Sequence, residues 1–202
     1  MIEYIVKDIA DFTDEEYKKS FLNLSDIKKE KVKRFNNDNS KKCTIAGEML
    51  ARKLLARATG RPKEFFEIVY NENGKPFCAN VSGIYFNISH SATKVAAVVC
   101  KQEIGIDIEI IRPVNLKLAK RICTYDELVY IFGKKPSESD FETEKDAECI
   151  RRFLEVWTLK EAYLKCVGTG ITGFNDMLTM PTDYKKIKIA NDMYVMHIVT
   201  LI

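Results

Sequence analysis

Residues 104–111 have the sequence IGIDIEII, and they indicate how the rest of the chain is built. In a β-strand the side chains alternate between two faces, so the isoleucines share one face while Asp107 and Glu109 share the other. This predicts a strand anchored in a core with two carboxylates projecting together. Like charges this close repel unless a cation separates them. An all-oxygen site favours Mg²⁺, with Mn²⁺ as the alternative, over zinc. An edge strand with solvated acids is the other interpretation.

A second informative stretch is VWTLKEAYLKCVGTG at residues 156–170. Trp157, Glu161 and Lys165 are spaced four residues apart, so they lie along one face of a helix. They could form one wall of a site. Glu161 and Lys165 alone would also be an ordinary stabilising pair on a helix surface.

Two shorter patterns and a basic stretch point to a ligand rich in phosphate. The tripeptide GKP at 74–76 lies in a turn, and SHS at 89–91 lies at the end of an apolar strand. Residues 28–42 include seven Lys and Arg but only two acids, whereas the whole chain has a net charge of only +3. A basic patch of this size is typical of an anion-binding surface. His90, taken by itself, is more often a structural residue.

The composition is that of an ordinary globular protein, with 202 residues, 46% hydrophobic and 30% charged. This length predicts one or two domains and excludes a disulfide miniprotein or a disordered chain. The six cysteines form no C-x-x-C pair. The first residues, MIEYIVKDIADF, carry acids within their apolar run, unlike a signal peptide. We therefore expect a cytoplasmic protein with reduced, mostly buried thiols and no membrane span.

The two halves of the chain have a similar predicted order of elements. Thr13 with Glu16 predicts a capped helix, as does Thr124 before DELVYIF, and Gly60 with Pro62 ends another helix. We expect residues 133–148 to be an exposed, acidic insertion. The expected strands are 2–9, 66–70, 84–89, 94–100 and 104–111, with two or three more up to 202, and the expected helices are 13–22, one after Ser25, 44–58, 116–122, 126–132 and 148–167.

Taken together and in this order, GKP, FNISHS, GIDIE and WTLKEAYLK resemble the 4′-phosphopantetheinyl transferase superfamily. The likeness is to the surfactin-synthetase-activating type rather than the short trimeric holo-acyl-carrier-protein synthases. It includes SDIKKEKVKRF near the N-terminus and spans roughly residues 1–175. Asp107 and Glu161 are 54 positions apart, somewhat more than this type leads us to expect, and the excess falls in the acidic insertion.

This resemblance implies a fold of class α+β. The expected architecture is a pseudo-dimer of two similar α/β halves, residues 1–103 and 104–202, with the active site in the cleft between them. The N-terminal half would contact the nucleotide end of coenzyme A. The C-terminal half would hold the magnesium and face the carrier protein. Such a chain is expected to be a monomer, because the internal symmetry replaces a subunit interface.

The implied reaction moves the 4′-phosphopantetheine arm of coenzyme A to a serine of an apo acyl or peptidyl carrier protein and releases 3′,5′-ADP. The resemblance implies a magnesium site at Asp107, Glu109 and Glu161. Catalysis would rest on Glu161 as the base, directly or through a water, with Lys165 as the second choice. The residues expected to bind coenzyme A are Lys28, Lys31, Thr44, Gly74, Lys75, Pro76, Ser89, His90, Lys160 and Lys165.

The segment after GIDIE is the expected carrier-facing surface, because carrier proteins of this class are generally acidic around the modified serine. Its apolar and basic residues would suit such a partner, although 116–122 could equally be an amphipathic helix packed on the core. The acidic insertion is not expected to bind the carrier. Two other functions stay open on the residues alone: another magnesium-dependent phosphoryl or nucleotidyl transferase or hydrolase, and a nucleic-acid-binding module. The second lacks the aromatic residues that binding of single strands favours.

Overall fold

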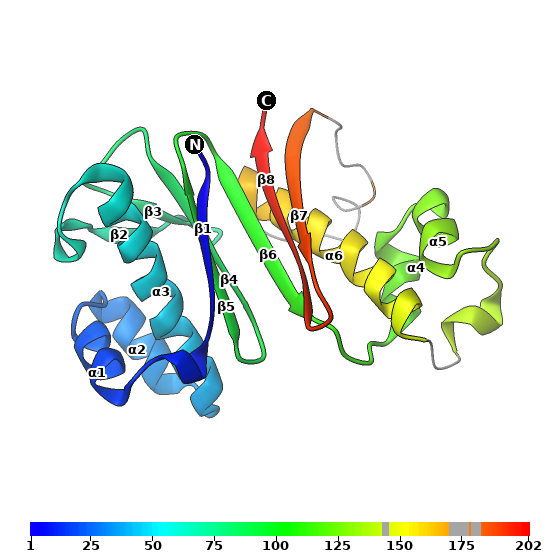
Figure 1. Cartoon of the computed structure of the whole chain (residues 1–202), viewed down its shortest axis with the longest axis horizontal. Coiled ribbons are helices and arrows are strands. Elements are labelled where there is room, and N and C mark those ends of the chain that lie inside the picture. The colour runs from blue at the N-terminus through cyan, green and yellow to red at the C-terminus, as the bar shows by residue number, and fades with distance from the viewer. Residues whose placement is uncertain (143–145, 170–177, 179–182) are drawn as a thin grey trace.

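The computed structural model describes residues 1–142, 146–169, 178 and 183–202. Its N-terminal part contains five strands, three helices and two short 3₁₀ turns among these residues (Figure 1). The elements are β1 (Glu3–Asp8), η1 (Ile9–Asp11), α1 (Asp14–Leu22), α2 (Asp26–Arg34), α3 (Asp38–Thr59), η2 (Lys63–Phe65), β2 (Ile68–Tyr70), β3 (Pro76–Cys78), β4 (Tyr85–Ser91) and β5 (Lys94–Cys100).

The C-terminal part follows directly and repeats the combination of a sheet with one long helix. Its elements are β6 (Ile104–Ile110), η3 (Leu116–Leu118), α4 (Ala119–Ile122), α5 (Tyr125–Phe132), η4 (Glu138–Phe141), α6 (Ala147–Val167), β7 (Tyr184–Ala190) and β8 (Tyr194–Leu201). Helices and antiparallel sheets occur together throughout, which confirms the α+β class.

Two antiparallel three-stranded sheets form the centre of the molecule, in the orders β1-β5-β4 and β6-β8-β7. Figure 1 shows them side by side, with α3 covering one sheet and α6 the other. From Val95 to Cys100, strand β5 is apolar because both of its faces are buried there. Val95, Ala97 and Val99 belong to the core beneath α3, whereas Ala96 and Val98 pack against the isoleucines of β6.

The two sheets meet along β4 and β6 through side chains of β4. Asn87 Oδ1 accepts a hydrogen bond from the N–H of Ile106 at 3.4 Å. Ser89 Oγ and Ser91 Oγ accept from the next two alternate amides of β6, at 3.4 and 3.2 Å. Polar residues at every second position of FNISHS therefore fix how β4 and β6 lie against each other.

Most of the predicted elements are present, and capping residues set their limits. Thr13 accepts a hydrogen bond from Glu16 N at 3.2 Å, and Thr124 accepts from Glu127 N at 3.3 Å, as the capping boxes predicted. Helix α3 begins six positions before the predicted start, because Asn37 accepts from Asn39 N and Ser40 N and caps it there.

Three further local differences appear along the chain. The short strand β3 was not predicted, and it pairs with β2. The predicted helix at 116–122 is a 3₁₀ turn followed by a single α-helical turn. Part of the expected insertion also packs on the core, since Phe141 is only 7% exposed and meets the Phe132 ring edge-on.

Two further features concern the helices as possible membrane spans and the state of the cysteines. None of the helices in the described part of the chain combines the length and apolarity needed to span a membrane. All six cysteines are free and buried, as expected.

Candidate active site

Gly105 allows helix α6 to lie directly on strand β6. A Cβ atom at this position would be 2.0 Å from the carbonyl oxygen of Ala162 and 2.4 Å from the amide nitrogen of Cys166. Because both atoms belong to the helix backbone, they cannot move aside as a flexible side chain would. The missing side chain thus brings Glu161 and Lys165, the neighbours of these two residues, close to Asp107.

Asp107 is the buried centre of the site, with only 4% of its surface exposed. Its Oδ1 accepts a hydrogen bond from Lys165 Nζ at 2.6 Å and from Ser89 Oγ at 2.8 Å. Lys165 Nζ also donates to Ser89 Oγ at 3.0 Å. The other carboxylate oxygen of Asp107, Oδ2, is buried with no hydrogen-bond partner in the part of the chain that the structure describes.

Two further carboxylates face the same space. Glu161 is 8% exposed, and its Oε1 likewise finds no partner among the described residues. Burial, with the nearby charge of Asp107, raises the pKa of Glu161 to about 7. Burial also raises the pKa of Glu109, although Ser91 donates a hydrogen bond to its Oε2. A buried carboxylate without a partner is costly, so this cluster favours the approach of a cation or a proton.

The donor set suits a hard divalent cation such as Mg²⁺. All three carboxylates line one pocket of about 280 Å³, and two of them present unpartnered buried oxygens. They do not form a closed metal site: within the described residues, no group of three or more His, Cys, Asp or Glu is arranged to hold a metal ion. Lys165 instead supplies a positive charge at one oxygen of Asp107.

Three pockets follow one another along this part of the molecule. The carboxylate pocket shares Ile88, Glu161 and Lys165 with a pocket of about 260 Å³ that also includes the turn at 74–76. It shares Glu109 and Trp157 with a third pocket, of about 610 Å³. The carboxylates thus stand between two other hollows.

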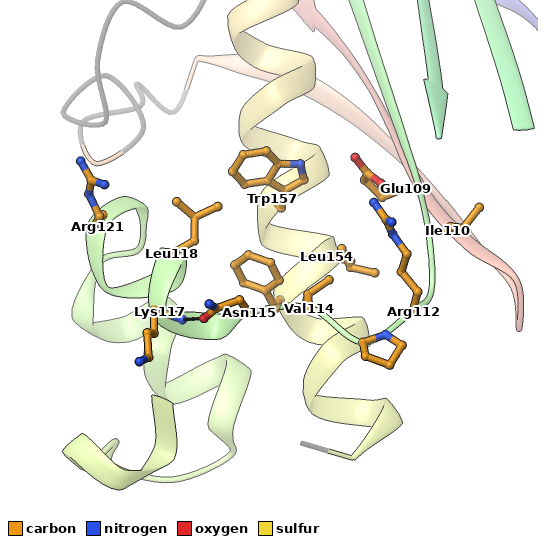
Figure 2. Close-up of a pocket in the computed structure, with 12 residues that line it drawn as sticks. Glu109, Ile110, Arg112, Val114, Asn115, Lys117, Leu118, Arg121, Leu154 and Trp157 are labelled. Atoms are coloured by element: carbon orange, nitrogen blue, oxygen red, sulfur yellow. Dashed lines mark hydrogen bonds between the residues drawn. The ribbon is translucent and has the colours of Figure 1, made fainter. Parts of the chain in front are cut away.

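The third pocket is apolar in its centre and basic at its edge (Figure 2). Val114, Leu118, Leu154 and Trp157 line its interior, and Glu109 marks the side nearest the carboxylates. Basic side chains also line it, at Arg112, Lys117 and Arg121.

Cations gather around His90, which also lines the carboxylate pocket. Desolvation, together with Lys165 and Lys28, lowers the pKa of His90. Burial and the charge of Lys31 lower the pKa of Lys28. Such mutual repulsion is relieved when an anion binds among the positive groups.

The ring of Tyr70 supports Lys28 in this basic cluster. Lys28 Nζ lies 4.2 Å from the centroid of the Tyr70 ring. The hydroxyl of Tyr70 donates a hydrogen bond to Glu48 Oε2 at 3.4 Å, and Arg52 Nη2 donates one to Glu48 Oε1 at 2.9 Å. Glu48 and Arg52 are both buried, so the ring that carries Lys28 rests on a fixed support.

Several of the predicted site residues come together in these pockets. Ser89, His90, Asp107, Glu109, Glu161 and Lys165 line the carboxylate pocket, and Gly74, Lys75 and Pro76 line the neighbouring one. The ammonium of Lys75, however, binds Glu103 and the carbonyl oxygen of Cys166, so it ties the turn to the end of α6.

Four predicted residues, Lys28 among them, are absent from the lining of the three pockets. Lys160 is 2% exposed, and its Nζ pairs with Glu127 of α5 at 2.8 Å. Thr44 is half-buried on α3. Lys31 lines a separate groove beside α2 with Phe35, although its positive charge helps to lower the pKa of Lys28 and of His90.

The sequence pattern did not point to the residues that support this cluster of carboxylates and cations. Asn87 and Ser91 were not assigned a role, although their alternation with Ser89 in β4 was visible. The support of Lys28 by Tyr70 and Glu48 had no sequence signal, because these residues are far apart in the chain and meet only after folding.

Comparison with known proteins gave matches over both halves of the chain. A model described as "4'-phosphopantetheinyl transferase, N-terminal" matches residues 11–102, and one for the 4′-phosphopantetheinyl transferase superfamily matches residues 103–195. The 4′-phosphopantetheinyl transferase Sfp of Bacillus subtilis (strain 168) is 29% identical over 181 residues, which cover 89% of this chain and 73% of Sfp.

Two other relatives are at a similar level of identity. A second Bacillus subtilis 4′-phosphopantetheinyl transferase is 30% identical over 85% of this chain and 69% of its own length. The 4′-phosphopantetheinyl transferase gsp of Aneurinibacillus migulanus is 32% identical over 74% of this chain. That alignment covers 58% of gsp, less than two thirds of its length.

Proposed function

Since this chain belongs to the 4′-phosphopantetheinyl transferase superfamily, we propose that it transfers the phosphopantetheine arm of coenzyme A to a serine of an apo acyl or peptidyl carrier protein. The observation that carries the proposal is the order of the three pockets. The carboxylate pocket, which includes His90 of the basic cluster, lies between the hollow at the turn 74–76 and the hollow with an apolar floor and basic rim. This order suits a reaction in which an anionic nucleotide and an acidic protein bind on either side of the reacting atoms.

The nucleotide end of coenzyme A would bind at the basic cluster. Its 3′-phosphate would lie among Lys28, Lys31 and His90, whose mutual repulsion an anion relieves. Thr44 and Ser89 remain proposed contacts. The turn at 74–76 would border the adenine, and Lys75 would contribute through its backbone and alkyl chain, because its ammonium is engaged with Glu103.

Lys160 does not fit this binding site. Its ammonium is buried and paired with Glu127, on the side of α6 that faces α5. We therefore assign contact with the diphosphate to Lys165 alone on this helix. Lys165 Nζ already donates a hydrogen bond to Asp107 Oδ1, so we assign it a phosphate contact rather than the role of base.

Asp107, Glu109 and Glu161 would hold Mg²⁺, with Mn²⁺ as an alternative. When bound, the ion supplies positive charge that offsets the charge of the diphosphate. The unpartnered oxygens of Asp107 and Glu161 support this assignment.

The proposed chemistry is a phosphoryl transfer in which the chain's residues align the partners. The serine Oγ bonds to the β-phosphorus, and the bond from this phosphorus to the bridging oxygen breaks. The bridging oxygen leaves with 3′,5′-ADP. Glu161, which lines the same pocket as Asp107 and Lys165, would accept the serine proton directly or through a water. Lys165 holds the diphosphate in line.

The carrier would dock at the third pocket. Its apolar floor and the basic side chains of Arg112, Lys117 and Arg121 complement an acidic, partly apolar helix. Charges at the rim of an interface act mainly on the association rate. Lys117→Glu combined with Lys120→Glu should therefore raise the KM for the carrier and leave the KM for coenzyme A unchanged. An unchanged KM for the carrier would place docking elsewhere.

We also propose that the two halves, residues 1–103 and 104–202, form a pseudo-dimer with the active site in the cleft between them. Each half has a three-stranded antiparallel sheet covered by one long helix. The site draws on β4 from one half and on β6 and α6 from the other. A monomeric, cytoplasmic enzyme fits this arrangement, and light scattering of the purified protein would test the monomer.

Mass spectrometry of apo carriers incubated with the protein, coenzyme A and Mg²⁺ tests the main proposal. A carrier of the right class should gain the mass of phosphopantetheine, and omission of Mg²⁺ or the Asp107→Ala change should prevent the gain. Coenzyme A, but not ATP, should raise the melting temperature. Stabilisation by ATP without any change in carrier mass would favour the other magnesium-dependent enzymes.

A further inference from the structure

An acidic segment, residues 138–142, forms ion pairs with one lysine that lines the third pocket and with one that lies three positions further along the chain. Lys117 Nζ, on η3, lies 2.8 Å from Glu142 Oε2. The ammonium of Lys120, on α4, pairs with Glu138 of η4 and lies 4.5 Å from the centroid of the Phe141 ring. The acids therefore neutralise two lysines next to the expected docking surface.

Other contacts already hold this segment in place. The Phe141 side chain is buried against the Phe132 ring, with 5.0 Å between the centroids. Asp140 accepts hydrogen bonds from Ser137 N and Ser137 Oγ and pairs with Lys134 at 2.9 Å. The segment thus has an apolar anchor and a closed capping box.

Glu138 and Glu142 differ from these anchoring residues because they are exposed. Their side chains are 90% and 60% exposed, so their ion pairs are weak and easily exchanged. An acidic side chain from a partner could replace either of them at its lysine without unfolding the segment.

We propose that Glu138 and Glu142 act as specificity residues that compete with the carrier for Lys117 and Lys120. A carrier must place its own acids on these lysines, so strongly acidic carriers displace the segment and weakly acidic ones do not. The inference rests on the proposed function, since it assumes that a carrier docks at the third pocket. It differs from simple repulsion by the insertion, because the acids occupy the same lysines that the carrier uses.

The test uses Glu138→Gln combined with Glu142→Gln in the full chain. With an acidic apo carrier at low salt, the KM for the carrier should fall about threefold to tenfold, since two exposed ion pairs no longer compete. The difference should shrink at high salt. The KM for coenzyme A should stay the same, because neither residue lines the carboxylate pocket.

Two controls separate competition from a general change of charge. Glu15→Gln with Glu67→Gln makes the same change in net charge on exposed residues before residue 104, and it should leave the KM for the carrier unchanged. In a protein that already carries Lys117→Gln and Lys120→Gln, the two glutamate changes should have no further effect. Melting temperatures close to that of the unchanged protein would show that each variant is folded.

The possible outcomes are distinct. The proposal fails if the glutamate changes leave the KM for the carrier as it was, if the charge control lowers it equally, or if the effect persists without the lysines. If the unchanged protein modifies no apo carrier at all, the proposed function fails instead. Direct calorimetric titration of the carrier onto each variant gives a second measurement that does not depend on turnover.

Discussion

Replacing Tyr70 by leucine tests whether its ring prepares Lys28 for the 3′-phosphate of coenzyme A. The ring lies 4.2 Å from Lys28 Nζ and is oriented through its hydroxyl by Glu48. Leucine keeps apolar contact but removes the π-electrons that attract the ammonium. The Lys28 side chain would then sample more rotamers, and binding of the phosphate would have to restrict them.

The size of the effect follows from the setting of Lys28. A cation–π contact contributes about 0.5–1 kcal/mol when exposed and about 2 kcal/mol when desolvated. Lys28 is half-buried, so we take about 1 kcal/mol, which corresponds to a rise of about fivefold in the KM for coenzyme A. Removing the lysine itself, in Lys28→Ala, should cost about 1.5–3 kcal/mol, or at least tenfold.

The assay compares coenzyme A with its 3′-dephospho form, with carrier modification followed by mass spectrometry. Tyr70→Leu should raise the KM for coenzyme A and leave that for the dephospho form nearly unchanged. Tyr70→Phe keeps the ring and should change either value less than about twofold. If the KM rises equally for both substrates, Tyr70 is a packing residue only, and the reasoning is refuted. Titration of 3′,5′-ADP by calorimetry repeats the comparison without catalysis.

Other predictions follow from the carboxylates, from the close approach of α6 and from a buried histidine. Asp107→Ala and Glu161→Gln should abolish carrier modification, whereas Glu109→Ala should retain part of it, because water can replace one ligand. Gly105→Ala should lower the free energy of unfolding in urea by about 3 kcal/mol, as its Cβ meets helix backbone; unchanged stability would contradict that contact. Burial lowers the pKa of His197 from 6.5 to about 4, so the folded state favours the neutral ring. Stability should fall as the pH drops from 6.5 towards 4, and less so in His197→Asn.

Local sequence signals predicted the elements well where they were self-contained. The capping boxes at Thr13 and Thr124 fixed two helix starts, and the alternation in 104–111 predicted β6 and its buried isoleucine face. The predicted start of α3 was wrong because Asn37, which caps the helix, lies in a polar stretch without apolar periodicity. Strand β3 has only three residues and begins with proline, so no pattern marked it.

The sequence predicted which carboxylates and which lysine of α6 come together in one pocket, but it predicted less of what surrounds them. Glu161 and Lys165 share a helix face by spacing alone, and Asp107 lies opposite them because glycine precedes it by two positions. The partner of Lys160 was not predictable, because residues one position apart on a helix point in different directions and only packing shows which neighbour each one meets. For the same reason, the pairing of Lys117 with Glu142 had no signal in the sequence.

The hydrogen bonds from β6 to the side chains of β4 make three amides a natural reporter of motion between the two three-stranded sheets. The amide protons of Ile106, Ile108 and Ile110 are covered by oxygens of Asn87, Ser89 and Ser91, which belong to the sheet β1-β5-β4. Their exchange with deuterium requires only that the two sheets separate slightly, whereas exchange in the middle of a sheet requires the sheet to open. Measured residue by residue with and without coenzyme A, these three rates would report whether the two sheets move relative to each other when a ligand binds.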